Sequence, residues 1–243
     1  MDLFSKLHQP STIAFLRAYP TPDAAQRKRV DDIVQTLKAA GHTRATQVAP
    51  QLWQALQQPQ LQADPVTTRT KARLMLALLA QLQPVMEQIA AYDEQIERLF
   101  LRHADSALFA SLPRAGKRLA PRLLAEIGDD RRRYSDAAGL QALAGTAPVL
   151  RKSGNYAKAH RRTACLKPLR NAMQHFAWQS TLEESWAMTY YQRKRAEGKS
   201  HSVAVRALAN SWLRIIYALW RDCRPYRTDI FTAAQQQQRR KAA

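Results

Sequence analysis

An unbroken heptad pattern between residues 75 and 99 constrains the fold of this chain more than any other feature. Apolar side chains recur there at alternating spacings of three and four residues: Met75, Leu78, Leu82, Val85, Ile89, Tyr92, Ile96 and Leu99. This spacing is typical of a coiled-coil seam, which would make the protein a homo-oligomer. An amphipathic helix within a bundle produces the same pattern over so short a length, so both interpretations stay open.

The rest of the chain also favours helices. Glycine is scarce, at 7 of 243 residues, and strand-like alternation is almost absent. Helix start signals precede three early segments: Ser11 before residues 12–19, Thr21-Pro22-Asp23 before a helix reaching Ala40, and Asp64-Pro65 before the longest helix. We expect Pro50 and Pro59 to interrupt a glutamine-rich helix, and Pro84 to kink the longest one.

Four regions follow from these patterns. We predict a helical linker region at 1–63, a coiled-coil helix at 64–104, an all-helical domain at 105–226 and a disordered basic tail at 227–243. Within the third region, helices are predicted near 136–143, 166–181, 183–197 and 201–222, with room for a short hairpin in the loop after Gly145. The fold class is mainly α.

The charge balance indicates the kind of partner. The formal net charge is +19 and the isoelectric point about 10.6, which favours binding to a polyanion such as nucleic acid. We find no run of about eighteen apolar residues and no signal peptide, so we expect no membrane association. Cys165 and Cys223 fit neither a disulfide framework nor a metal site. These features predict a cytoplasmic protein.

One short loop is the strongest candidate for chemistry. It contains Lys152-Ser153-Gly154, and further cations flank this step on both sides. The glycine lets backbone amides approach a phosphate, and the cations would stabilise developing negative charge. Serine is a weak nucleophile without such help or a neighbouring base, a role for which His175 is one candidate. A solvated basic loop, whose serine only caps a turn and whose His175 is a surface residue, is the alternative.

A second basic segment begins at Leu112 and reads as helix, tight turn, helix. Gly116 would direct the amides at the start of the second helix toward a phosphate, an arrangement that grips backbone rather than reads bases. A plain helical connection with solvated arginines is equally compatible with the sequence. Together the two segments give these candidate nucleic-acid-binding residues: Arg114, Gly116, Lys117, Arg118, Arg151, Lys152, Gly154, Lys158, His160, Arg161, Arg162, Lys167 and Arg170.

The order of several motifs resembles a known protein family. They are Leu112-Pro-x-x-Gly116, Gly145-x-Ala147-Pro148, Lys152-Ser153-Gly154 and Gly198-Lys199-Ser200-His201. In this order and spacing they resemble the insertion sequence 110 type transposases, and the similarity covers nearly all of the chain. One departure is Arg114-Ala115, where the family favours a glycine and an apolar residue. The segment from Leu112 to Asp129 resembles the family's helix-hairpin-helix-like entry.

This resemblance implies a mechanism. Family members combine a resolvase-like nuclease domain, which carries four metal-binding acids, with a C-terminal domain that contributes a nucleophilic serine. Ser153 matches that serine, which would form a covalent 5′-phosphoserine link to DNA while Mg²⁺ on the other domain stabilises the charge. A structured RNA encoded by the element would select the DNA sites.

The resemblance also sets limits on what we expect of this chain. No strand-borne aspartate precedes Ser11, so the sequence looks like a truncated transposase without the acids or a metal site. We expect it to act in the bacterial cytoplasm near the nucleoid, and to bind DNA and element RNA without cutting DNA on its own. One alternative is a non-catalytic regulator that pairs with a full-length transposase through the heptad seam. Another is a coiled-coil adaptor with negligible affinity for DNA.

Overall fold

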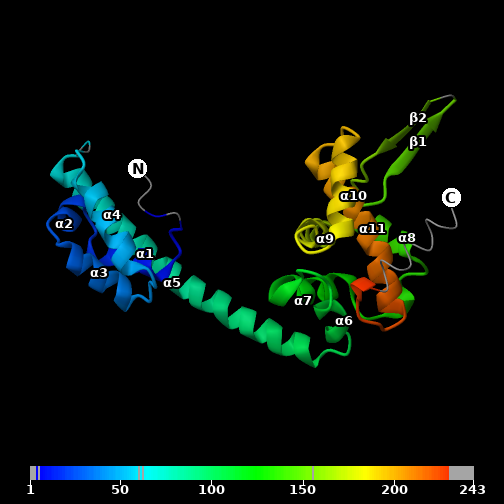
Figure 1. Ribbon diagram of the computed structural model, residues 1–243, viewed down its shortest axis with the longest axis horizontal. Helices are drawn as coiled ribbons and strands as arrows, with labels where there is room; N and C mark the ends of the chain where they lie inside the picture. The colour runs from blue at the N-terminus through cyan, green and yellow to red at the C-terminus, as the bar shows by residue number, and fades with distance from the viewer. Residues whose placement is uncertain (1–3, 5, 60, 62, 155, 230–243) are drawn as a thin grey trace. The chain divides into compact units, whose positions relative to one another are not determined.

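The computed structural model describes residues 4, 6–59, 61, 63–154 and 156–229 (Figure 1). These residues form two compact units, 1–91 and 92–243. The protein is mainly α, as predicted, and the tail from residue 230 onward lies outside the described residues. In chain order the elements are α1 Pro10–Ala18, α2 Pro22–Gln26, α3 Val30–Ala39, α4 Ala45–Gln57, α5 Pro65–Arg102, α6 Ser106–Ala110, α7 Gly116–Ile127, the 3-10 helix η1 Arg131–Arg133, α8 Ala137–Leu143, β1 Val149–Ser153, β2 Tyr156–His160, α9 Lys167–Ser180, α10 Ser185–Ala196 and α11 His201–Arg221.

The first unit has a core of its own, built by α1 to α4. Ile33 and Leu37 of α3 are fully buried and pack with Phe15 of α1 and Leu52 of α4. The indole Nε1 of Trp53 donates a hydrogen bond of 2.9 Å to the carbonyl of Lys28, which ties α4 to the segment before α3. Residues predicted to be a linker therefore carry a small hydrophobic core.

Two predictions about helix boundaries in this unit are wrong, one about a start and one about an end. Helix α1 begins at Pro10 after Gln9, so Ser11 is a buried helical residue rather than a cap. Thr21 does cap a helix, accepting a hydrogen bond from the amide of Ala24 at 3.2 Å, but that helix ends at Gln26. A new helix begins after Arg29, because the carboxylate of Asp32 accepts the Arg29 amide at 3.1 Å and so caps α3.

Proline interrupts the helices less than predicted. Pro50 lies inside α4, which runs unbroken to Gln57, and Pro84 lies inside α5. An internal proline removes one backbone hydrogen bond, and in α4 the burial of Leu52 and Leu56 against the core offsets that loss.

Helix α5 carries the heptad seam on an exposed face. Leu78, Val85 and Tyr92 are 55%, 55% and 61% exposed, so the seam is not buried in the core of either unit. Helix α5 also has a mean hydropathy of 1.3 over its most apolar 18-residue window, and by length and composition it is a candidate membrane span. This criterion alone is weak evidence, because an exposed apolar seam satisfies it as well. The coiled coil stays a prediction.

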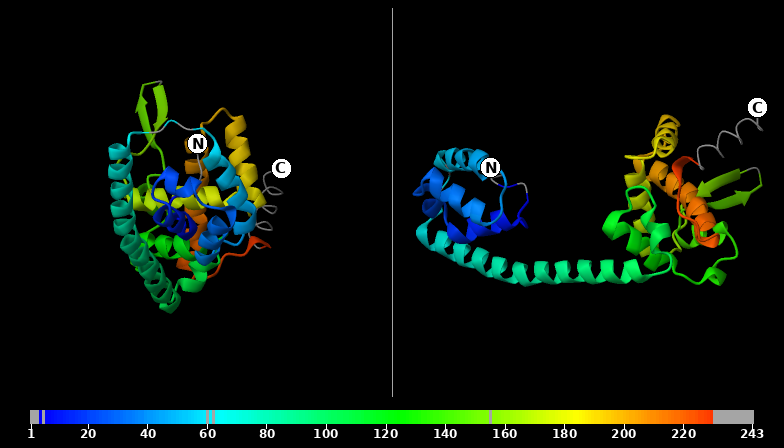
Figure 2. Two further views of the ribbon diagram at one scale, coloured as in Figure 1. Left: turned by 90° about the vertical axis from the view of Figure 1, so that its left-hand side faces the viewer. Right: turned by 60° about the horizontal axis from the view of Figure 1, so that its bottom comes forward.

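The second unit is organised around α9 and α11, which pack against each other (Figure 2). Phe176 of α9 meets Trp212 of α11 with ring centroids 5.0 Å apart, and both side chains are fully buried. The indole Nε1 of Trp212 donates to Oγ of Ser180 at 2.7 Å, which satisfies both buried groups. Helix α7 packs on α9, and α8 packs on α11. Ser200 occupies the N-cap position of α11, and its side chain makes no capping hydrogen bond.

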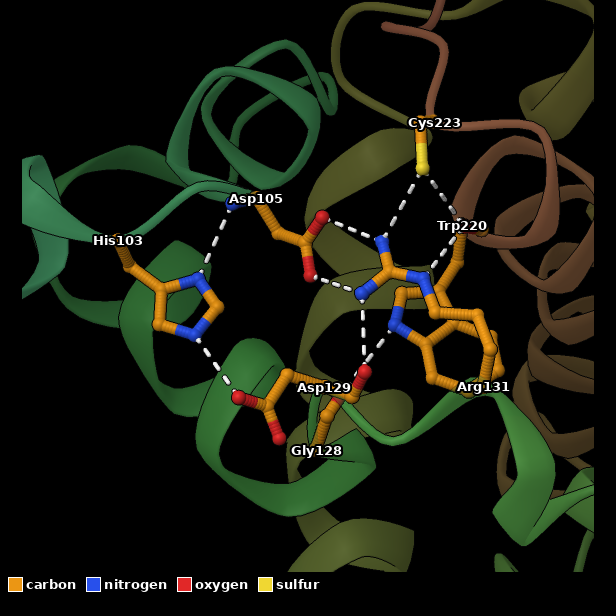
Figure 3. A network of polar contacts seen from close by, with 7 residues as sticks. All are labelled: His103, Asp105, Gly128, Asp129, Arg131, Trp220 and Cys223. Atoms are coloured by element: carbon orange, nitrogen blue, oxygen red, sulfur yellow. Dashed lines mark hydrogen bonds and ion pairs between the residues drawn. The ribbon is translucent and has the colours of Figure 1, made fainter.

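A polar network connects the turn between α5 and α6 with the turn after α7 (Figure 3). The guanidinium of Arg131 forms a two-pronged ion pair with the buried carboxylate of Asp105, just after α5. Its Nε donates to the carbonyl of Trp220 at 3.2 Å, while the Trp220 indole donates to the carbonyl of Gly128 at 3.0 Å. The hydrogen bond to Asp105 raises the pKa of Arg131. This network joins α11 to the start of the domain.

The second unit is not wholly helical, contrary to the all-helical prediction for residues 105–226. Strands β1 and β2 form an antiparallel hairpin in the loop where the sequence left room for one. The hairpin contains Ser153, so its geometry determines what that residue can do.

Candidate nucleic-acid interface

The register of the hairpin decides which side chains lie beside Ser153. Arg151 pairs with Lys158, and Ser153 pairs with Tyr156 at the end of the ladder. Directly paired residues of an antiparallel ladder share one face, and alternate residues along a strand share it too. The pairing therefore gathers one set of side chains, here called the serine face: Val149, Arg151, Ser153, Tyr156, Lys158 and His160. The other set, the alanine face, consists of Leu150, Lys152, Ala157 and Ala159.

This register separates two residues that are neighbours in the sequence. Lys152 immediately precedes Ser153, yet it lies on the alanine face. Arg151 and Lys158 come to the same face as the serine, together with the Tyr156 ring. Of the predicted cations in this loop, the structure brings Arg151 and Lys158 beside Ser153 and directs Lys152 to the opposite side.

Arg151 and Lys158 are an unfavourable pair in the absence of a ligand. Like charges placed directly opposite each other destabilise a two-stranded ladder, and an isolated hairpin is only marginally stable in water. Almost every described side chain of this hairpin is exposed on both faces. A bound polyanion would remove the repulsion between the two cations, so the arrangement suits a nucleic-acid backbone.

The turn and the base of the hairpin differ in their surroundings. Gly154 adopts φ +54°, a conformation that glycine reaches without strain, and no atom lies within 4 Å of the place a Cβ would take. The base is held by the rest of the domain: the amide of Leu166 donates to the carbonyl of Leu143 at 2.8 Å, and Oγ1 of Thr146 donates to Oδ1 of Asn210 at 2.8 Å. An exposed tip thus projects from a fixed base.

Ser153 itself is exposed, at the end of β1. It is not buried among apolar side chains, and it is also not set into an enclosed hollow. The cations Arg151 and Lys158 on its face are also exposed. His175 is exposed on α9, and no hydrogen bond of the described residues joins it to Ser153.

The second basic segment, between α6 and α7, is arranged differently. Arg114 adopts φ +56°, a left-handed conformation that costs a non-glycine residue roughly 1–2 kcal/mol. Lys117 Nζ lies 2.8 Å from Glu97 Oε1, and Arg118 forms an ion pair with Asp93, both acids belonging to α5. The hydrogen bond that Lys117 donates to Glu97 raises the pKa of Lys117. Two of the predicted cations here are therefore already paired with carboxylates.

Sequence reasoning missed two residues near the hairpin. Tyr156 was not singled out because its position beside Ser153 depends on the strand register. Arg206 was not singled out because it lies in the apolar helix α11, which the sequence identified as core. The only indication in the sequence was that Arg206 follows Val205, a buried residue, at the edge of the apolar face of this helix.

The chemistry of a metal site is not present on these residues. Among the described residues, no group of three or more His, Cys, Asp or Glu side chains could hold a metal ion. The Mg²⁺ that the family resemblance implies therefore does not fit the part of the chain that the structure describes.

Comparisons with known proteins agree with the motifs. Residues 106–192 match the model of the transposase IS116/IS110/IS902 family. The chain is 32% identical over 208 residues to a Streptomyces coelicolor protein assigned as the mini-circle transposase for IS117, covering 85% of this chain and 50% of that protein. It is 32% identical over 226 residues to the 42 kDa protein of insertion element IS900 from Mycobacterium paratuberculosis, covering 92% of this chain and 56% of the relative.

A third relative is the 43.6 kDa protein of insertion element IS110 from Streptomyces coelicolor, 28% identical over 218 residues, with 89% of this chain and 53% of the relative covered. The chain thus spans about half the length of these relatives. The family model covers the basic turn, the hairpin, α9 and most of α10. Residues 106–192 of this chain are therefore a domain of the IS116/IS110/IS902 transposase family.

Proposed function

We propose that this chain acts in DNA transposition, as the part that grips nucleic acid and presents Ser153 to a phosphate. The observation that carries the proposal is the register of the hairpin, which places the serine between Arg151, Lys158 and Tyr156 on one exposed face. The net charge of +19 supports the same class of ligand, because many phosphate contacts follow from such an excess of cations.

The proposed step is an attack on a DNA phosphate. Oγ of Ser153 forms a bond to phosphorus while the bond from phosphorus to the 3′ oxygen breaks, giving a 5′-phosphoserine link and a free 3′-hydroxyl. The serine proton is released to water, and the departing oxygen takes one up. Arg151 and Lys158 would stabilise the charge that accumulates on the phosphate oxygens in the transition state. The reverse attack by a 3′-hydroxyl would rejoin the strand and release the serine.

Other components complete the reaction in this proposal. A nuclease domain with metal-binding acids, on the same or another polypeptide, supplies the Mg²⁺ chemistry that the family resemblance implies. A structured RNA from the element selects the DNA, so the present chain grips backbone and shape rather than reads bases. The exposed heptad seam of α5 would join copies of the chain.

Formation of a serine–DNA bond tests the proposal. The chain would be incubated with Mg²⁺, DNA ends of the element, its RNA and a polypeptide that supplies the nuclease acids. Trypsin cleaves after Lys152 and Lys158, so any adduct on Ser153 appears in one short peptide, residues 153–158. Mass spectrometry should find that peptide carrying a 5′-phosphorylated nucleotide, and Ser153→Ala should abolish the adduct.

Ser202→Ala is the matched control, since Ser202 is an exposed serine of α11 outside the hairpin. It should leave adduct formation unchanged. Strand cleavage by the Ser153→Ala protein, or an adduct on another residue, would overturn the catalytic part of the proposal.

A second function, non-catalytic binding that modulates a full-length transposase, is favoured by one observation. Ser153 lies on an open surface, and no hydrogen bond of the described residues links it to a base. On this account Ser153→Ala changes neither DNA binding nor recombination in a complemented system, whereas the first account requires the loss of recombination. The same variant therefore separates the two functions.

A further inference from the structure

Three arginines from distant parts of the sequence converge near the base of the hairpin. Arg161 directly follows β2, Arg170 lies in the first turns of α9, and Arg206 lies in the second turn of α11. Their proximity follows from the fold, because α9 packs against α11. Arg170 and Arg206 each lie six residues before a ring of the Phe176–Trp212 contact that joins the two helices, and burial together with the charges of Arg161 and Arg170 lowers the pKa of Arg206.

None of these arginines has a counterion in the part of the chain that the structure describes. Within the described residues, no ion pair includes Arg161, Arg170 or Arg206, although other half-buried or exposed cations of this unit do find carboxylates, as Arg131 does with Asp105. Arg170 donates only a long contact of 3.7 Å to Sγ of Cys165. In the segment between β2 and α9, Nε of Arg162 is buried and has no hydrogen-bond partner among the described residues.

This arrangement is costly unless an anion completes it. Arg170 and Arg206 are half-buried, so water screens their repulsion less than it would on an open surface. A guanidinium presents donors in a rigid fork that matches the oxygens of a phosphate, and it cannot lose its proton to relieve the repulsion. Helix α9 adds to the preference for negative charge, because its first turn has no acidic residue and no side-chain cap.

We propose that Arg161, Arg170 and Arg206 form a binding site for a single backbone phosphate of the nucleic acid, separate from the phosphate that meets Ser153. Val149 pairs with His160, the neighbour of Arg161, and Ser153 lies four residues further along β1. At about 3.3 Å per residue, the serine is roughly 13 Å from the base of the hairpin. The site therefore anchors the backbone while the tip of the hairpin reaches another phosphate. This inference rests on the nucleic-acid binding of the proposed function, and not on cleavage.

Salt-dependent binding without Mg²⁺ tests the site. Fluorescence anisotropy would measure the affinity of the full chain for a labelled DNA duplex at a series of KCl concentrations. The affinity for an RNA hairpin of similar length would be measured in parallel. Arg206→Met should weaken binding about tenfold and reduce the slope of log K against log [KCl] by roughly 0.7–0.9, the value for one phosphate contact. Arg214→Met is the control, because Arg214 is an exposed arginine of the same helix.

A slope change specific to Arg206→Met with either nucleic acid supports the site. Equal losses in both variants would mean diffuse attraction to charge and would overturn it. Wild-type protein that fails to bind either nucleic acid would instead overturn the proposed function, so the two failures are distinguishable.

Thermal stability gives a readout that a merely structural arginine would not produce. In the absence of ligand, Arg206→Met removes a repulsive charge from the cluster, so its Tm should rise by a few degrees. Inorganic phosphate should raise the Tm of the wild type above that in KCl of equal ionic strength, and the rise should vanish in Arg206→Met. A lower Tm for Arg206→Met, with an unchanged salt slope, would show that the residue only supports packing.

Discussion

At Gly145, backbone conformation and packing both exclude a side chain. The residue has φ +65°, and a Cβ there would lie 2.7 Å from both Cβ and Sγ of Cys165. Gly154, at the tip of the hairpin, has a similar φ of +54° but open space around it. The two glycines, one after α8 and one in the hairpin turn, therefore separate the cost of an unfavourable conformation from the cost of crowding.

We expect Gly145→Ala to destabilise the protein by about 2–4 kcal/mol, the sum of left-handed strain and overpacking against Cys165. Gly154→Ala should cost only the conformational part, about 1–2 kcal/mol, and only within the hairpin. Urea unfolding followed by tryptophan fluorescence measures the first, since the buried Trp212 and Trp220 report on this domain. An equal, small loss in both variants would show that the contact with Cys165 yields easily.

At the residue scale, sequence reasoning could identify the candidates but not their neighbours. The sequence around Ser153 was sufficient to single out Arg151 and Lys158, because a hydroxyl among cations is visible in the residue types alone. Which cation shares a face with the serine depends on the register of the strands, and the turn at Gly154 fixes that register. Arg206 could not be found in this way, because only the packing of α9 on α11 brings it near the hairpin.

At the scale of elements, the hairpin makes a prediction about which face binds. The serine face carries Arg151 and Lys158 directly opposite each other, whereas the alanine face carries a single cation, Lys152. Lys158→Gln removes the like-charge pair and should stabilise the hairpin by a few tenths of a kcal/mol to about 1 kcal/mol. The same change should weaken DNA binding and adduct formation.

Lys152→Gln makes the matched comparison. It removes the same charge from the other strand, on the alanine face of the hairpin. Hydrogen exchange of the β1 and β2 amides would measure the stability of the hairpin, and anisotropy would measure DNA affinity. Greater protection together with weaker binding in Lys158→Gln, and neither in Lys152→Gln, would identify the serine face as the contact surface. The opposite pattern would assign the contact to Lys152.

Helix boundaries show why element prediction partly failed. The start of α2 was predictable because Thr21, Pro22 and Asp23 are local signals, and the structure confirms the cap. The break before α3 was missed because the Asp32 carboxylate, an unremarkable acid in the sequence, caps a new helix. Pro50 was overestimated as a helix breaker because the burial of neighbouring leucines is a tertiary effect.

At the scale of the whole molecule, the exposed apolar seam of α5 is the feature that binding to a partner would explain. The boundary between the two compact units falls within this helix, between residues 91 and 92. Its seam is exposed on both sides of that boundary, with Ile89 50% and Ile96 46% exposed. An apolar stripe left exposed to water costs free energy, and pairing with a second copy of the same helix would remove that cost.

We therefore expect the protein to be a dimer or larger at micromolar concentration, as measured by sedimentation equilibrium. Ile89→Lys places a charge in the seam and should shift the protein toward monomer, because a lysine buried between two helices loses its hydration. Ala91→Lys adds the same charge at an exposed position of α5 outside the seam and should leave the oligomeric state unchanged. A wild-type monomer would contradict the coiled coil. If both variants dissociate, association depends on net charge. If only the Ile89→Lys variant dissociates, association depends on the apolar stripe.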